Sequence, residues 1–181
     1  MPEFKSKPFL SGGSDTGSTD RCLRDMVALS TLPAMWLGAE PLRIAESLAS
    51  SLFTTLNPEF VYVSFTDGPG RPPIAVAQTD RYGTSAQIAD CIGAPILERA
   101  RAHDPDDFLM LSNPLGSGFL RVAVRPLGAH AELGVIAAAF AEDDQPMPVH
   151  RLILNVSASQ ASTAVQSARL LRALRESEER N

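Results

Sequence analysis

Residues 59–80 read EFVYVSFTDGPGRPPIAVAQTD, and this stretch decides the class of fold. Side chains in its first half alternate as they do along a strand: Val61, Val63 and Phe65 against Tyr62, Ser64 and Thr66. A turn rich in glycine and proline follows, and residues 74–79 then form a second apolar run. Two such runs joined by a Gly/Pro turn predict a β-hairpin.

Helical patterns precede this hairpin. Residues 19–32 combine a Ser/Thr cap candidate with apolar residues at helical spacing, and we expect this helix to end at Pro33. Residues 41–56 repeat apolar side chains every three or four positions. Pro41 suits the first turn of that second helix, because its missing N–H has no intrahelical partner there.

Helix and strand patterns also follow the hairpin. Residues 84–103 indicate a helix that is interrupted or restarted at Gly93–Pro95. The rest of the chain predicts a short strand at 107–111, two longer strands at 119–127 and 132–142, and a helix from about 149 to 180. Because most strands are joined by hairpins, we predict an α+β fold with an antiparallel sheet of five or six strands.

Composition argues against several classes of function. The 181 residues carry a net charge of −5 with no basic cluster, so we expect no nucleic-acid binding. No apolar run reaches the roughly 18 residues of a membrane span, and no signal-peptide pattern is present. We therefore expect a soluble, cytoplasmic protein without membrane contact. Residues 1–18 are rich in Ser, Gly and Thr, which predicts a disordered tail, part of which could be vector-derived.

The cysteines and histidines are scattered along the chain. Cys22 and Cys91 match no metal-ligand or redox spacing, and the three histidines lie far apart at His103, His130 and His150. This pattern predicts no metal site.

Several longer phrases resemble GAF domains, which are sensory and dimerisation modules of signalling proteins. Residues 28–67 (ALSTLPAMWLGAEPLRIAESLASSLFTTLNPEFVYVSFTD) resemble the opening helices and first strand of bacterial GAF domains. Residues 124–140 (VRPLGAHAELGVIAAAF) resemble their penultimate hairpin, and residues 150–171 (HRLILNVSASQASTAVQSARLL) their closing helix. Residues 174–180 (LRESEER) are similar to the linker that precedes a PAS domain in sensor histidine kinases. The resemblance covers about residues 22–180.

The resemblance implies a profilin- or PAS-like sheet whose N- and C-terminal helices pack on one face. It implies a GAF domain at residues 19–168 and the start of a signalling helix at 169–181, leading to a downstream PAS or kinase domain. The implied function is that of a regulatory module of a bacterial two-component sensor histidine kinase. Such a module binds a small molecule, here unidentified, and relays the signal through its C-terminal helix. No catalytic histidine box or nucleotide box occurs, so we expect no enzymatic activity in this fragment.

A ligand-free dimerisation or spacer module is the alternative, with a diguanylate cyclase or a transcription activator as other possible parents. In either case we expect a homodimer formed through the N- and C-terminal helices. Small and apolar residues of the last helix supply stripes for the sheet and for a partner helix: Ala158, Ala161, Ala164, Ala168, Leu170, Leu171 and Leu174. Residues 170–180 contain no signal that ends a helix, so we expect this helix to continue into another domain.

The sequence contains none of the cofactor-binding motifs of known GAF domains that we considered. Cys91 lies in ADCIGAP, but neither the histidine nor the Asp-Ile-Pro phrase of bilin-binding domains accompanies it, and the context of Cys22 does not match either. The Asn-Lys…Phe…Asp-Glu phrase of cyclic-nucleotide binders is absent, as is the cysteine cluster of methionine-sulfoxide reductases. We expect no bilin, haem or metal, and the sequence does not identify a ligand.

Strand alternation suggests where a ligand could bind. Val61, Val63 and Phe65 should face the helical layer, which leaves Tyr62 and Ser64 on the opposite side of the sheet. On the strand at 119–127 we expect the apolar set to face the same helical layer, so that the alternate residues, Phe119, Arg121 and Arg125, would join Tyr62 and Ser64.

With Cys91 on the helix above the sheet, the predicted ligand-binding set is Tyr62, Ser64, Cys91, Phe119 and Arg121. These residue types suit an anionic or hydrogen-bonding ligand. In the competing interpretation Arg121 extends to solvent and Tyr62 only covers the core.

Overall fold

The computed structural model describes residues 33–66, 68, 70–80, 85–102, 108–114, 116–144 and 148–180. After a helical turn at 33–35, the elements in chain order are α2 (Pro41–Leu56), β1 (Phe60–Phe65), β2 (Ile74–Gln78), α3 (Ser85–Ala102), β3 (Leu109–Ser112), β4 (Phe119–Leu127), β5 (Gly134–Ala141) and α4 (Pro148–Glu178). The expected tail at 1–18 and helix at 19–32 lie outside the described residues. Pro33 was expected to end a helix, but it lies within the helical turn instead.

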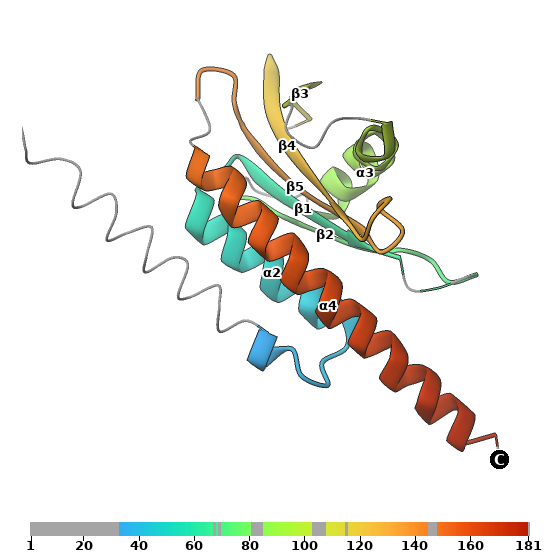
Figure 1. The fold of residues 1–181 in the computed structure, drawn as a ribbon. Helices are drawn as coiled ribbons and strands as arrows, with labels where there is room; N and C mark the ends of the chain where they lie inside the picture. Colours follow the sequence, from blue (N-terminus) through green and yellow to red (C-terminus); the bar gives the residue numbers. More distant parts are fainter. Residues whose placement is uncertain are drawn as a thin grey trace, which may run out of the picture.

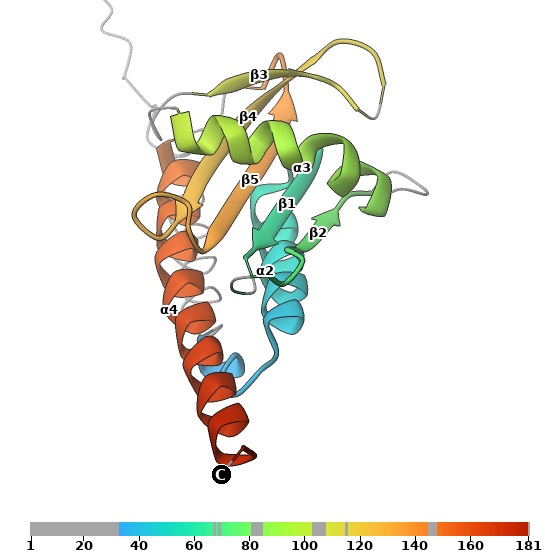
Figure 2. The same ribbon diagram turned by 90° about the vertical axis from the view of Figure 1, so that its right-hand side faces the viewer.

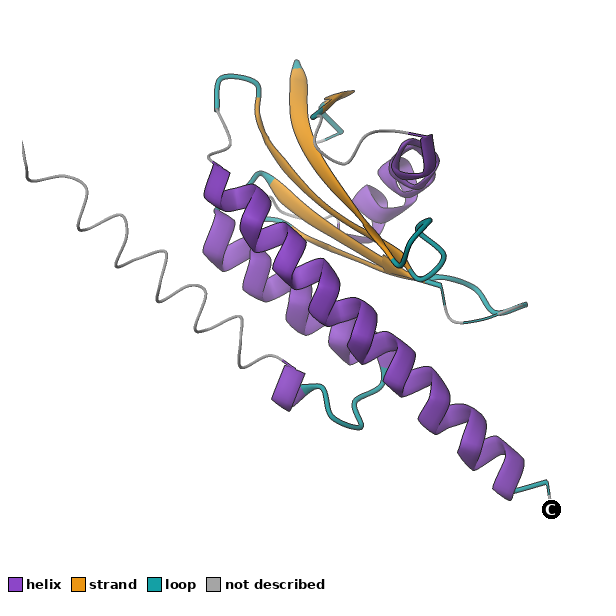
Figure 3. Ribbon diagram, in the orientation of Figure 1, coloured by secondary structure: helices purple, strands orange, loops and turns teal. Residues whose placement is uncertain are grey.

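The five described strands form one antiparallel sheet in the order β2-β1-β5-β4-β3 (Figure 3). β1 and β5 lie at its centre, paired from Phe60 opposite Ala139 to Phe65 opposite Gly134. The predicted α+β class and the antiparallel sheet are confirmed. The hairpin at 59–80 forms as β1 and β2, with Val63 opposite Val76.

Helices cover both faces of the sheet. α2 and α4 lie side by side on one face, and α3 crosses the other (Figures 1 and 2). The first core packs α2 and α4 against Val61, Val63 and Phe65 of β1. The second core packs α3 against the alternate residues of the same strands, including Tyr62 and Val122. Each of the six residues of β1 is consequently buried.

α2 has clear sequence-encoded boundaries. Pro41 occupies the first turn after Glu40, and Asn57 adopts the left-handed conformation at the C-terminal end. Its apolar stripe is fully buried against β1, β2 and α4: Ile44, Ala45, Leu48, Ala49 and Leu52. The bounds match the predicted 41–56.

α3 is continuous where a break was expected. It runs from Ser85 to Ala102 with Pro95 inside it. Proline removes one N–H and therefore the bond to the carbonyl four residues earlier, which is that of Cys91. Cys91 and Pro95 both lie on the exposed side of the helix, where water can solvate that carbonyl.

α4 is 31 residues long, or about 46 Å at 1.5 Å per residue. Its first two thirds pack on the sheet through residues that include Leu154, Ala158, Ala161 and Val165. Its last turns extend past the sheet (Figure 1), and Leu170, Leu171 and Leu174 are exposed there. The division of the chain at residue 168 stays a prediction.

At Gly134 the backbone of β5 lies close to the backbone of β1. Its φ is +137°, and a Cβ there would lie 1.9 Å from the Ser64 carbonyl oxygen. We expect Gly134→Ala to lower the free energy of unfolding by roughly 2–4 kcal/mol, because backbone strain and overpacking add. Gly118 also has a positive φ (+89°) but has open space around it, so Gly118→Ala should cost only about 1–2 kcal/mol. Equal losses in urea unfolding would contradict the close approach.

Candidate functional site

Tyr62 and Ser64 lie on the α3 face of the sheet, as predicted. Tyr62 is 4% exposed and belongs to the second core, with Ile92 and Ile96 of α3. Ser64 is also buried, and its side chain hydrogen-bonds to Tyr62. The two residues therefore form a polar pair beneath a helix.

The other three members of the predicted set do not converge on this pair. Phe119 and Arg121 lie on the α4 face of β4, because Arg121 is paired with Phe140 of the first core. Cys91 is on α3 but is exposed. The predicted five-residue cluster is therefore wrong as a geometric arrangement, and whether any of the five contacts a ligand stays a prediction.

The error arose from the orientation of β4. Its strongest apolar residues, Leu120, Val122 and Val124, pack under α3 and not under α2 and α4. Since both faces of the sheet are covered, the more apolar side of a strand does not indicate which helical layer it meets. Ala123 and Leu127 complete the first core on the α4 face of the same strand.

α3 packs directly on the hydroxyl group of Tyr62. A Cβ added to Gly93 would lie 2.5 Å from Tyr62 Oη and 3.3 Å from Cζ, so glycine permits the contact. Burial raises the pKa of the Tyr62 phenol, the hydrogen bond with Ser64 opposes this rise, and the charge of Asp90 adds to it. Tyr62 consequently stays a neutral hydrogen-bonding group at physiological pH.

Arg125 is a buried charge on the α4 face. It is 4% exposed; its Nε donates to Asn155 Oδ1 of α4, and its Nη1 donates to the Val124 carbonyl oxygen at 2.8 Å. Arg125 and Asn155 border an open groove of about 440 Å³ between the end of β4 and α4. Arg125 thus links β4 to α4. Contrary to the expectation from the sequence, it does not lie on the same face of the sheet as Tyr62.

His150 lies in the first turn of α4 and stacks on Phe140, with ring centroids 5.3 Å apart and an angle of 4° between the ring planes. Its Nδ1 is buried and has no hydrogen-bond partner. Burial lowers the pKa of His150 below its ordinary value of 6.5, and the charge of Asp144 partly opposes this. No pattern in the sequence indicated that the His150 ring would be partly buried.

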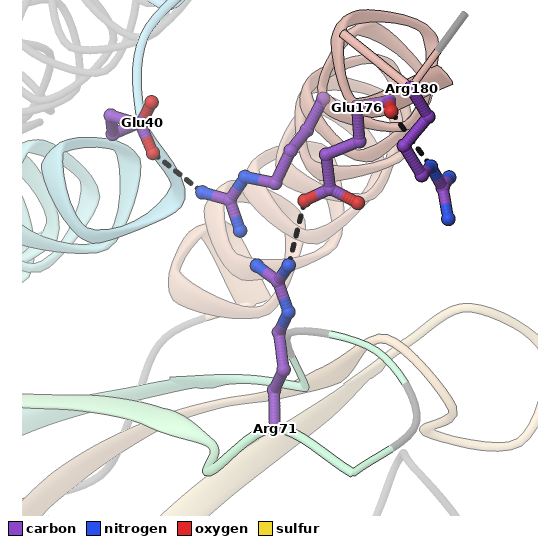
Figure 4. Close-up of polar contacts among 5 residues, drawn as sticks. Glu40, Arg71, Glu176 and Arg180 are labelled. Carbon is purple, nitrogen blue, oxygen red and sulfur yellow. Dashed lines mark hydrogen bonds and ion pairs between the residues drawn. The ribbon is translucent and has the colours of Figure 1, made fainter.

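Ion pairs hold the distal part of α4 to the rest of the domain. Arg172 Nη2 lies 2.5 Å from Glu40 Oε2, just before α2, and Arg71 Nη2 of the β1–β2 loop lies 2.7 Å from Glu176 Oε1 (Figure 4). Both pairs are partly exposed, where such a pair contributes at most about 1 kcal/mol. They bridge residues more than 100 positions apart, so no local sequence pattern indicates them.

A second groove lies between residues 33–38 and α4. It has a volume of about 430 Å³, and Trp36 and Gln160 are among the residues that line it. Trp36 Nε1 and Gln160 Oε1 are both buried and without a hydrogen-bond partner. Sequence reasoning missed this groove, because it depends on how a short loop meets α4.

Within the described ranges, no three His, Cys, Asp or Glu side chains gather as metal ligands. In the part of the chain that the structure describes, no helix has the length and apolar character needed to span a bilayer.

The arrangement of sheet and helices is shared with solved structures. The GAF domain of a candidate sensor histidine kinase from Pseudomonas syringae pv. tomato superposes with a TM-score of 0.56 at 15% identity, over 88% of this chain and 95% of that one. The chain has the fold of GAF domains. GAF3 of Slr1393 from Synechocystis sp. PCC6803, solved in its photoproduct state, gives a TM-score of 0.50 at 15% identity, over 75% of this chain and 99% of that one.

A third GAF domain, from Acinetobacter phosphoenolpyruvate-protein phosphotransferase, gives a TM-score of 0.51 at 9% identity, over 86% of this chain and 96% of that one. No family model matches the sequence, and no curated protein is significantly similar to it. The GAF fold predicted from the sequence is therefore confirmed by structure, at identities that carry no information about ligand.

The contact between Gly93 and Tyr62 predicts a thermodynamic coupling. Gly93→Ala should destabilise the chain more when Tyr62 is present than in a Tyr62→Phe background, because phenylalanine lacks the hydroxyl group that the new methyl group would meet. We expect a coupling free energy of about 1–2 kcal/mol in a double-mutant cycle of urea unfolding. Additive effects of the two substitutions would show that α3 does not rest on the phenol.

His150 predicts a loss of stability in mild acid. Because its folded-state pKa lies below 6.5, the unfolded chain binds the proton first as the pH falls. Stability should therefore be retained above about pH 6.5 and decrease as the pH falls towards the folded-state pKa. His150→Gln should flatten this part of the stability profile, measured by urea unfolding between pH 5 and 8.

His130 provides the matched control for that experiment, because it lies in the β4–β5 turn. His130→Gln should leave the decrease in place. If both variants flatten the profile equally, or neither does, burial of His150 is not its cause.

Proposed function

We propose that this chain is a regulatory GAF module of a bacterial two-component sensor histidine kinase, which forms a homodimer and relays a signal through α4. The observation that carries the proposal is the distal part of α4. Leu170 and Leu174 are 67% and 61% exposed, although they continue a helix whose earlier turns are in the core. Burying leucines at this spacing against a partner helix is more favourable than leaving them exposed to water.

The same face of α4 continues towards its N-terminal end. Leu152 and Val156 are exposed there, and the small side chains of Ser159 and Thr163 lie between them and the distal leucines. A second copy related by a two-fold axis could pack on the distal leucines, Leu170 and Leu174, and would leave Ser159 and Thr163 uncovered. The Pseudomonas structure, from a protein described as a candidate sensor histidine kinase, supports the proposed parent.

Relay through α4 requires two arrangements of the helix that a signal stabilises unequally. The ion pairs of Glu40 with Arg172 and of Arg71 with Glu176 are weak enough to be exchanged at small cost. A small molecule bound under α3 would contact Tyr62 and Ser64, whose strand also forms the core beneath α4. β1 thus offers a physical connection between such an input and α4.

A ligand-free dimerisation or spacer module is the second candidate. The direct packing of Gly93 on Tyr62 favours this candidate, because α3 itself then covers the Tyr62 hydroxyl group, where a ligand would lie. Native mass spectrometry separates the two candidates. Mass in excess of whole chain multiples, lost on denaturation, supports the sensor, whereas a dimer without added mass supports the spacer.

The dimer surface can be tested by introducing charge. Leu170→Glu together with Leu174→Glu should raise the dimer dissociation constant at least tenfold, because a carboxylate cannot be buried at a helix seam without a large cost. Analytical ultracentrifugation over a range of concentrations measures this constant. Leu42→Glu is the matched control, an equally drastic change at an exposed leucine (47%) on α2.

The outcomes discriminate clearly. The proposal requires a wild-type dimer that Leu42→Glu leaves intact and the double variant weakens. A wild-type chain that stays monomeric at high micromolar concentration, or a dimer that all variants keep, would overturn the proposed interface.

A further inference from the structure

We propose that the groove between residues 33–38 and α4 is a binding site for an uncharged, elongated and largely apolar molecule with hydrogen-bonding groups along one edge. This site is separate from Tyr62 and Ser64, which lie beneath α3 on the other face of the sheet. The inference goes beyond the proposed function, because it stands whether or not α4 relays a signal.

The size of the groove suits a small organic molecule. Its volume is about 430 Å³, within the usual range of ligand sites of about 300–1,000 Å³. Trp36 and Leu37 form one wall, and Ala164, Ala168 and Leu171 supply apolar surface on α4. The small alanines keep the α4 side of the groove open.

Hydroxyl groups line one edge of the groove. Ser159, Thr163 and Ser167 are four residues apart, so they form a row on one side of α4 that spans about 12 Å. All three are exposed. Thr163 donates its proton to the Ser159 carbonyl oxygen at 3.2 Å, and its hydroxyl oxygen can still accept a hydrogen bond. An elongated ligand with polar atoms on one side would match this row.

Two unsatisfied polar atoms point independently to a ligand. Trp36 is 4% exposed, and its Nε1 has no acceptor; Gln160 Oε1 is buried and has no donor. Both side chains line the groove. Leaving a buried donor and a buried acceptor unpaired costs free energy that a suitable ligand would recover. Since both atoms are covered in the ligand-free chain, binding would include a small outward movement of residues 33–38.

The charge of the ligand follows from the lining. Among the described residues that line the groove, none is charged. Arg172 and Arg175 border a smaller cleft at one end, outside the groove itself, and Arg172 is paired there with Glu40 at 2.5 Å. An ionised ligand would lose its hydration in the groove without gaining a charged partner, so a neutral molecule is favoured.

The test uses two probes with one skeleton, N-phenyl-1-naphthylamine and its sulfonated relative 1-anilinonaphthalene-8-sulfonate. Trp36 is the only tryptophan in the chain, so energy transfer from its fluorescence detects a naphthylamine bound to the domain, and the variants below locate that probe in the groove. With the full chain, we expect saturable transfer to the neutral probe at a ratio of one per chain. The sulfonated probe should bind at least tenfold more weakly.

Ser167→Phe should fill the groove and weaken binding of the neutral probe at least tenfold. Gln166→Phe places the same side chain at the neighbouring exposed position, outside the groove lining, and should change binding less than twofold. Ser159→Phe provides a second block at the other end of the hydroxyl row, should Ser167→Phe fail to fold by circular dichroism.

Each outcome decides the matter. Tight, stoichiometric binding of the neutral probe that the groove variants abolish and Gln166→Phe preserves supports the site. Three results would overturn it: no saturable transfer, equal effects of the groove and control variants, or tighter binding of the sulfonated probe.

Discussion

Burial of the two central strands on both faces is the constraint on which the rest of this structure depends. β1 pairs along its full length with residues 134–139 of β5, and both faces of these paired segments are buried. A sheet of this kind needs two helical layers, one of α2 and α4 and one of α3 (Figure 2). The backbone hydrogen bonds of the central strands are then made in an environment that excludes water, where leaving them unmade would be costly. Removing either layer would expose one of the two cores.

Small side chains on β5 allow both helical layers to approach. Ala137, Ala138 and Ala139 alternate between the two faces, so each core has a shallow place at the centre of the sheet. Large residues come instead from the neighbours, Phe60 and Phe65 of β1 among them. Alternate residues of one strand belong to the two cores, so only the backbone of the sheet separates the packing under α3 from the layer that contains α4. That closeness is the physical basis for any coupling between the two faces.

Local patterns in the sequence carried the elements but not their orientation. The bounds of α2 and β4 agree with the prediction, since proline, asparagine and alternation are local signals. The continuity of α3 through Pro95 was missed, because exposure of the affected carbonyl depends on tertiary packing. The prediction of which β4 side chains face which helical layer was wrong for a related reason. The expected approach of Arg121 to Tyr62 depended on that prediction and was therefore wrong too. Trp36, Gln160 and His150 became visible only in the folded chain, since unsatisfied atoms and stacked rings have no sequence signature.

The length of α4 gives its small motions a large reach. About 20 Å of helix separate Val165, the last residue that is fully in the core, from Glu178. A straight helix acts over that distance as a lever, so that a tilt of about 5° at the core displaces the far end by nearly 2 Å. Adjustments too small to disturb the packing of the sheet would thus be amplified at the end of the helix.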